Sequence, residues 1–407
     1  MAVLAYITSV AQRTSFGVAG LEATERFSTN ASILATFSVV QLLVYSLGQI
    51  PVGLLLDRVG PRAMISTGTV LMLCGQAFLA FATDVPQGLV GRVLVGAGDA
   101  MVFVSAIRLL PMWFSGSRIP LLTQLTGTVG QAGQLISLFP FHAVLIMVGW
   151  TPAFAMLSAL SFVALILVIA FVRNGYTGPN VAGGPQLKTR QRLAAAWRQP
   201  GTRLGFWTHF STAFMLNVFL MTWGFPFLVE GQGLPGSLAS ALMSMFVIVA
   251  VLLGPILGTL TARFPNQRSK FALTIVGTMT LVWLLVILWP GQAPLWLLIV
   301  LMAAIAAGGP GSAISFDFAR TFNPPRLMGT ATGVVNVGGF FGGFICVYLV
   351  GLTLDFIHRL NGYSGELYSL ESMKMALSIQ FIFVIIGVTG MLITRRKARQ
   401  QQQNPTD

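Results

Sequence analysis

The sequence predicts an all-α integral membrane protein with twelve transmembrane helices arranged in two six-helix halves. Only 9% of the 407 residues are charged and 55% are hydrophobic, whereas soluble domains carry about 25% charged residues. The apolar residues form long runs without period-two alternation, and a helix needs about 20 of them to cross a bilayer. Because backbone polar groups in lipid must be satisfied within their own segment, we expect these runs to be helices.

The spans follow from reading the apolar runs against glycine, proline and charged breaks. The twelve expected spans are 2–22, 30–56, 63–83, 87–113, 119–147, 150–172, 203–229, 236–262, 269–290, 294–320, 327–354 and 372–394. Six precede and six follow the longest polar stretch. The expected organisation is an N-terminal half at 1–172, a linker at 173–202 with a short surface helix around Leu193–Trp197, a C-terminal half at 203–394 and a tail at 395–407.

The distribution of basic residues predicts the orientation. If both ends, the linker and every second loop are cytoplasmic, 17 of the 24 lysines and arginines lie inside, three lie outside and four lie within spans. This satisfies the positive-inside rule and predicts a cytoplasmic membrane protein with both termini inside. The rule also explains the net charge of +13 without a nucleic-acid partner. We expect the chain to work as a monomer in the lipid bilayer.

An internal repeat supports the two halves. Gly53, Leu55 and Arg58, after the second span, recur as Gly258, Leu260 and Arg263 after the eighth, all at an offset of 205. Repeats at equivalent places in two halves suggest parallel repeats that enclose a site at their interface.

The first copy resembles the signature loop of the major facilitator superfamily between helices 2 and 3, and the run Arg92–Ala100 resembles the family's helix-4 motif. With the twelve spans and the linker, the resemblance covers essentially the whole chain. It implies secondary active transport by alternating access, with a conformational latch at the membrane rim. The latch residues it implies are Gly53, Asp57, Arg58, Gly60, Arg62, Arg92 and Arg263. The alternative is that Arg58 and Arg62 only set the topology.

Ionisable residues inside spans are costly and mark substrate or proton routes. Arg13 lies about 18 Å along the first helix, counted at 1.5 Å per residue. The segment around it resembles helix 1 of anion:cation symporters, where an arginine binds an anionic substrate. The alternative for Arg13 is an ion pair within the bundle.

The other intramembrane charges lie on the fourth and tenth spans. Arg92 and Asp99 are seven residues apart and share a helix face. We expect Arg92 to have a structural role. Arg108 either lines the inner vestibule or has a structural role. Asp317 and Arg320 form either a local i, i+3 salt bridge or a pair that opens when Asp317 takes a proton.

His209 on the seventh span either couples protons or packs helices, and Asn217 lies on the same span. The candidate substrate-binding residues are Arg13, Arg108, His209, Asn217 and Arg320. The candidate proton-coupling residues are Asp99, Asp317 and His209.

The excess of intramembrane arginine over acid, four against two, favours proton-coupled uptake of a small organic anion. The alternative is proton-coupled efflux of drugs or metabolites, which predicts lipophilic or cationic substrates. The sequence has no zinc-binding helix motif, nucleophile elbow or phosphate-binding loop. We therefore expect no enzyme, no catalytic residues, no cofactor and no metal.

Overall fold

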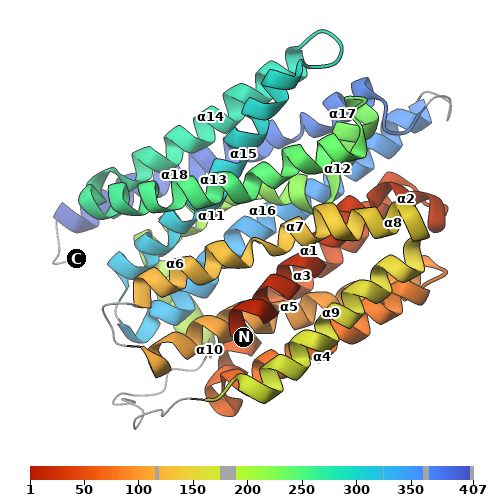
Figure 1. The fold of residues 1–407 in the computed structure, drawn as a ribbon. Coiled ribbons are helices and arrows are strands. Elements are labelled where there is room, and N and C mark those ends of the chain that lie inside the picture. The colour runs from red at the N-terminus through yellow and green to blue at the C-terminus, as the bar shows by residue number, and fades with distance from the viewer. Residues whose placement is uncertain (115–118, 175–188, 324, 361–365, 404–407) are drawn as a thin grey trace. The chain divides into compact units, whose positions relative to one another are not determined.

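The computed structural model describes the chain except residues 115–118, 175–188, 324, 361–365 and 404–407, and some helical residues by backbone alone. The described residues form helices and turns, without a strand (Figure 1). Eleven helical segments among them are long and apolar enough to cross a membrane. The predicted fold class is therefore confirmed at the level of its elements.

The helices before the linker reproduce the first six predicted spans to within a few residues. They are α1 (Ala2–Val18), α2 (Gly20–Arg26), α3 (Ala31–Val59), α4 (Pro61–Phe81), α5 (Val85–Trp113), α6 (Ile119–Gly130), α7 (Gly133–Ile136), the π-helical turn η1 (Ser137–Phe141), α8 (His142–Val148) and α9 (Trp150–Phe171). The first predicted span is divided at Ala19, so that α1 has 17 residues and α2 follows it. This shortness explains why eleven helical segments, and not twelve, reach spanning length.

The later helices match the remaining spans, but those of the eleventh and twelfth spans end at Leu360 and Gln403, beyond the predicted ends at 354 and 394. They are α10 (Thr189–Arg198), α11 (Pro200–Val218), η2 (Phe219–Trp223), α12 (Gly224–Pro226), η3 (Phe227–Gly231), α13 (Gly236–Arg263), η4 (Pro265–Gln267), α14 (Arg268–Leu288), α15 (Leu295–Phe322), α16 (Pro325–Leu360), α17 (Leu370–Leu377) and α18 (Gln380–Gln403). Helix α10 confirms the expected short helix of the linker. The seventh span contains two π-helical segments flanking Pro226, where proline removes a backbone donor.

The chain divides into two compact units, which we describe separately. The first unit holds residues 1–182, 220–229 and 234–247, and the second holds 183–219, 230–233 and 248–407. The end of the seventh span and the first part of the eighth thus group with the first unit. The predicted boundary at the linker remains a prediction.

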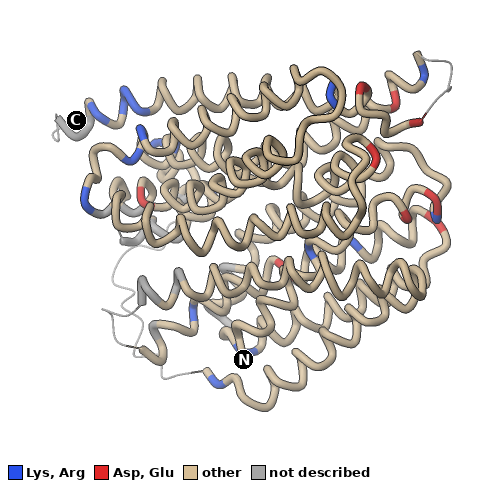
Figure 2. Tube along the Cα trace, turned by 45° about the horizontal axis from the view of Figure 1, so that its top comes forward, with Lys and Arg blue, Asp and Glu red and all other residues tan. Residues whose placement is uncertain are grey.

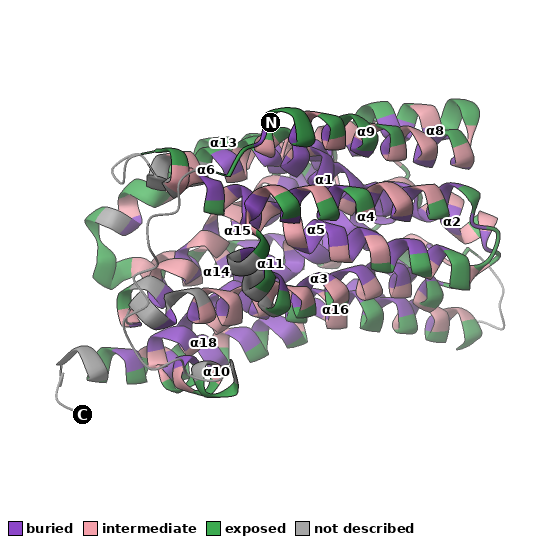
Figure 3. Cartoon of the chain, turned by 90° about the horizontal axis from the view of Figure 1, so that it is seen from below, coloured by how far each residue is buried: buried purple, intermediate pink, exposed green. Residues whose placement is uncertain are grey.

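Charge and burial follow the pattern expected of spanning helices. Figure 2 shows lysine, arginine and the acids mostly near helix ends, with long uncharged stretches between them. Figure 3 shows exposed residues along one side of α9, where Phe162, Ile166 and Ile169 are at least half exposed. Large apolar side chains on an outward face are what a lipid environment tolerates.

Small residues let neighbouring helices approach closely within each unit. In the first unit, a Cβ added to Gly68 of α4 would meet the carbonyl of Gly98 on α5, and one on Gly75 would meet the carbonyl of Gly91. In the second unit, a Cβ added to Gly338 of α16 would meet the carbonyl of Phe206 on α11. Such contacts rely on dispersion between backbones, which is the main attraction available to helices in lipid.

Candidate functional site

The first unit contains a buried ion pair between α1 and α5. Arg13 donates from Nε to Asp99 Oδ2 and from Nη2 to Oδ1, both at 2.7 Å. Ser9, one turn before Arg13, also donates to Oδ1 of Asp99. The side chain of Asp99 is 1% exposed and that of Arg13 is 12% exposed. Two-point pairing of this kind is the strongest hydrogen-bonded contact that a guanidinium makes with a carboxylate.

The local sequence holds both helices in place. Asp84 caps α5 by accepting a hydrogen bond from the Gln87 N–H at 2.9 Å. On α1 the hydroxyls of Thr14 and Ser15 donate to carbonyls one turn back. The guanidinium carbon of Arg13 lies 4.9 Å from the centre of the Tyr45 ring on α3. Three helices therefore fix the position of the Arg13 head group.

A second arginine is buried nearby without a hydrogen-bond partner. Arg92 is fully buried, and none of its three nitrogens has a partner among the described residues. Its guanidinium lies 4.9 Å from the centre of the Phe16 ring, which supplies only a cation–π contact. Burial of an ionised group without hydrogen bonds is costly. Arg92 is therefore a buried arginine whose donors are not used by the described residues.

Two buried glutamine side chains also lack hydrogen-bond partners among the described residues. The side chains of Gln41 on α3 and Gln76 on α4 are buried, and no described residue bonds to their nitrogen or oxygen. A Cβ on Gly96, one turn beyond Arg92, would meet Gln41. Gln76 follows Gly75, which packs on Gly91, the residue before Arg92. The two amides therefore lie at the level of Arg92, where they can accept from and donate to hydroxyl groups.

The position of Arg92 separates it from the predicted latch. Arg62 is 13 residues before Gly75, so Arg92 lies about 20 Å along the helices from Arg62, at 1.5 Å per residue. The head group of Arg92 lies in the interior beside Phe16 and not at the turn between α3 and α4, and its assignment to the latch stays a prediction.

The turn between α3 and α4 is tied to the end of α9. Gly60 has φ +82°, which a residue with a side chain rarely adopts. Arg62 donates from Nη2 to the Ile169 carbonyl at 2.7 Å, and its backbone N–H donates to Asn174 at 3.0 Å. Gly53, Asp57 and Arg58 belong to α3, but beyond the helical backbone they lie outside the described residues. Arg263 is exposed, with its guanidinium 5.6 Å from the Phe264 ring.

In the second unit, His209 and Asn217 of α11 hold one residue of α16. The Gly339 N–H donates to His209 Nδ1 at 3.0 Å, and Asn217 Nδ2 donates to the Gly339 carbonyl at 3.2 Å. The His209 ring also packs on Phe316, with centres 5.3 Å apart. This geometry matches the helix-packing interpretation of His209. Its predicted roles in substrate binding and proton coupling gain no support from these contacts.

Replacing Gly339 by alanine is expected to destabilise the protein by about 1–3 kcal/mol, the usual cost of overpacking. The added methyl group would meet the His209 ring and Ala213. Thermal unfolding in detergent measures the effect. Gly333→Ala on the same helix is the matched control, since nothing lies within 4 Å of its added Cβ. Equal unfolding temperatures for the two variants would contradict the close packing of α11 on α16.

The remaining charged candidates lie on α5 and α15. Asp317 of α15 lies beside Arg268 of α14, at 3.8 Å between Oδ2 and Nε. Its predicted partner Arg320 has a side chain outside the described residues. Arg108 is exposed, nine residues beyond Asp99 on α5. The structure thus brings together Arg13 and Asp99 and adds Ser9, Tyr45, Gln41 and Gln76, which the sequence analysis did not single out.

The fold, the charge pattern and the buried ion pair define a multi-pass membrane transporter. The Major Facilitator Superfamily model matches residues 2–347. The chain therefore belongs to the Major Facilitator Superfamily, and the resemblance found in the sequence is confirmed. Members of this family are transporters and not enzymes, as expected. The fold is similar to that of a bacterial homologue of the human lysosomal transporter Spinster, with a TM-score of 0.77, 16% identity, and coverage of 98% of this chain and 96% of that one.

The curated relatives include proteins named as transporters of anions. The D-galactonate transporter of Escherichia coli is 24% identical over 425 aligned residues, covering 94% of each chain. The probable nitrate/nitrite transporter of Mycobacterium tuberculosis is 25% identical over 338 residues, covering 81% of this chain and 80% of that protein. A match to the probable L-galactonate transporter of Escherichia coli, 25% identical over 170 residues, spans only 42% of this chain and 38% of that protein.

Proposed function

We propose that the chain carries a small organic anion together with a proton across a cytoplasmic membrane, by alternating access. The observation that carries this proposal is the composition of the buried cluster in the first unit. Two arginines, Arg13 and Arg92, face one acid, Asp99, and Arg92 lacks a hydrogen-bond partner among the described residues. A cluster with a net charge of +1 and unused guanidinium donors suits an anionic substrate.

The ion pair supplies a coupling mechanism. While Asp99 is ionised, its two carboxylate oxygens accept hydrogen bonds from Nε and Nη2 of Arg13. Protonation of Asp99 removes its negative charge and frees Arg13 to pair with a substrate carboxylate. The empty cluster and the cluster with both proton and monoanion carry the same net charge of +1. Binding the pair together therefore adds no net charge to the interior, which favours symport over binding of either ion alone.

The uncommitted amides point to a hydroxylated monocarboxylate, the class to which sugar acids belong. Gln41 and Gln76 offer donors and acceptors at the level of Arg92, where they would pair with hydroxyl groups of a substrate whose carboxylate lies on the arginines. Two relatives are named for galactonate, a molecule of this class. Nitrate has no hydroxyl group to meet the amides, and a cation would be repelled by the net positive cluster.

Thermal unfolding of the purified protein with D-galactonate, nitrate and tetraphenylphosphonium tests the substrate class. A ligand at about 100 times its dissociation constant adds about 2.7 kcal/mol of stability. We expect D-galactonate to stabilise the protein, Arg13→Gln to remove that effect, and Lys270→Gln to keep it, since Lys270 is an exposed cation on α14. Stabilisation by tetraphenylphosphonium alone would overturn the proposal and favour efflux of lipophilic cations.

The orientation and the latch remain part of this proposal. The basic residues in the last part of α18 support cytoplasmic termini by the positive-inside rule. Gly60 and Arg62, which tie the α3–α4 turn to α9, are the described residues that would stabilise one state at the membrane rim.

A further inference from the structure

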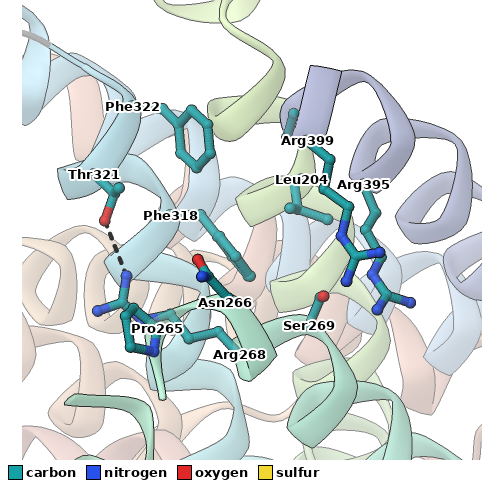
Figure 4. Close-up of a pocket in the computed structure, with 11 residues that line it drawn as sticks. Leu204, Pro265, Asn266, Arg268, Ser269, Phe318, Thr321, Phe322, Arg395 and Arg399 are labelled. Atoms are coloured by element: carbon teal, nitrogen blue, oxygen red, sulfur yellow. Dashed lines mark hydrogen bonds between the residues drawn. The ribbon is translucent and has the colours of Figure 1, made fainter. Parts of the chain in front are cut away.

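A second polar site lies within the second unit. A cavity of about 540 Å³ opens where the turn before α14 meets the ends of α15 and α18. Its polar wall contains three arginines, Arg268, Arg395 and Arg399, together with Asn266, Ser269 and Thr321 (Figure 4). Arginine guanidiniums beside amide and hydroxyl groups are the side chains that proteins use to hold phosphate oxygens.

One of the three arginines, Arg268, already donates hydrogen bonds within the protein. Arg268 donates to the Thr261 carbonyl at 3.1 Å and to Thr321 Oγ1 at 3.0 Å. The carboxylate of Asp317 lies 3.8 Å from its Nε and offsets its charge. Arg268 therefore shapes the wall and adds little net charge to the cavity.

The other two arginines are not offset in this way. Arg395 and Arg399 are one turn apart on α18, where two like charges repel. The Nε of Arg395 is buried and has no hydrogen-bond partner among the described residues. Figure 4 shows both side chains reaching from α18 toward the side of the cavity where Ser269 lies. An anion placed between them would relieve the repulsion and receive their donors.

The floor of the cavity is apolar. Leu204 and Phe318 are buried there and belong to one hydrophobic cluster with Ala398, while Phe322 packs against that cluster. The site lies where the apolar length of α18 ends, in a run that also contains Arg396 and Lys397. Basic clusters immediately beyond a transmembrane helix are typical of sites for anionic lipid head groups.

We propose that this cavity binds the phosphate group of an anionic phospholipid, with the phosphate on Arg395 and Arg399 and the apolar part of the lipid along Leu204 and Phe318. The same phosphate chemistry is available from free inorganic phosphate. The apolar floor and the position at the end of a spanning helix favour the lipid. A zwitterionic choline head group would bring a second cation to a wall that already has an excess of positive charge.

Native mass spectrometry of the full chain in a neutral detergent measures the binding. The probes are dihexanoyl phosphatidylglycerol, dihexanoyl phosphatidylcholine with the same acyl chains, and inorganic phosphate. We expect saturable binding of the phosphatidylglycerol, about tenfold tighter than that of either other probe. Arg395→Gln/Arg399→Gln is expected to weaken it about tenfold through the loss of two charge-assisted contacts.

The matched control removes the same charge from another face of α18. Arg396→Gln/Lys397→Gln should leave the affinity unchanged, because both residues line a different hollow. Equal loss in the two double variants would overturn the proposal by showing unspecific attraction to a basic tail. Inorganic phosphate binding as tightly as the lipid would overturn the lipid assignment. Arg399→Gln alone changes only an exposed side chain, so a partial loss in this variant supports the site even if the double variant does not fold.

Discussion

Replacing Asp99 by asparagine is expected to abolish proton-driven accumulation of substrate while exchange of substrate across the membrane continues. Asparagine keeps the shape and can still accept from Ser9 and Arg13, but it cannot take up a proton. One pH unit is worth about 1.4 kcal/mol and supports about tenfold accumulation by a one-proton symporter. In proteoliposomes with such a gradient, the wild-type chain should concentrate D-galactonate about tenfold, whereas the variant should only equilibrate it.

The control for this prediction lies on the same helix. Asp84→Asn makes the same chemical change at the capping residue of α5, where asparagine caps equally well. We expect Asp84→Asn to accumulate substrate as the wild type does. Concentrative uptake by Asp99→Asn would show that another group couples the proton, and Asp317 would then be the next residue to examine.

Replacing Arg92 by methionine is expected to weaken substrate binding and to raise the unfolding temperature at the same time. The guanidinium is fully buried without a hydrogen-bond partner among the described residues. An unsatisfied buried polar group costs about 1–3 kcal/mol, and more when it is charged. Methionine fills a similar length with apolar atoms. Loss of a charge-assisted contact to the substrate carboxylate should weaken binding by at least about tenfold.

The two readouts distinguish a functional arginine from a structural one. Calorimetry without ligand gives the stability, and the shift with D-galactonate gives the binding. Arg92→Lys, which keeps the charge but loses the paired donors, should recover part of the binding. A lower unfolding temperature for Arg92→Met would indicate that the arginine stabilises the empty protein, and its assignment to the substrate site would be withdrawn.

The elements of the fold could be predicted from the sequence because lipid imposes a simple rule. Uninterrupted apolar runs must be helical, and the breaks between them are marked by glycine, proline and charge. The span predicted at 150–172 is therefore found as α9, Trp150–Phe171. The rule does not predict where a helix is divided within an apolar run. The division of the first span at Ala19 was accordingly missed.

The candidate site was predicted only in part. Arg13 and Asp99 are recognisable because ionisable residues in spans are rare and costly. Their pairing depends on how α1 crosses α5, which no local pattern encodes, and the sequence offered Arg92 as the neighbour of Asp99 on its helix face. Gln41 and Gln76 went unnoticed because a neutral amide barely interrupts an apolar run. A search for amides within spans would have found them, since a buried amide needs partners as well.

The most direct test of the central claim is the proton balance of substrate binding. The purified protein is mixed with D-galactonate in a weakly buffered solution, and the pH change is compared with the amount bound. If Arg13 leaves a protonated Asp99 to hold the anion, binding should take up about one proton per D-galactonate in the wild type and none in Asp99→Asn. Binding to the wild type without proton uptake, or equal uptake in both proteins, would contradict coupling through the Arg13–Asp99 pair.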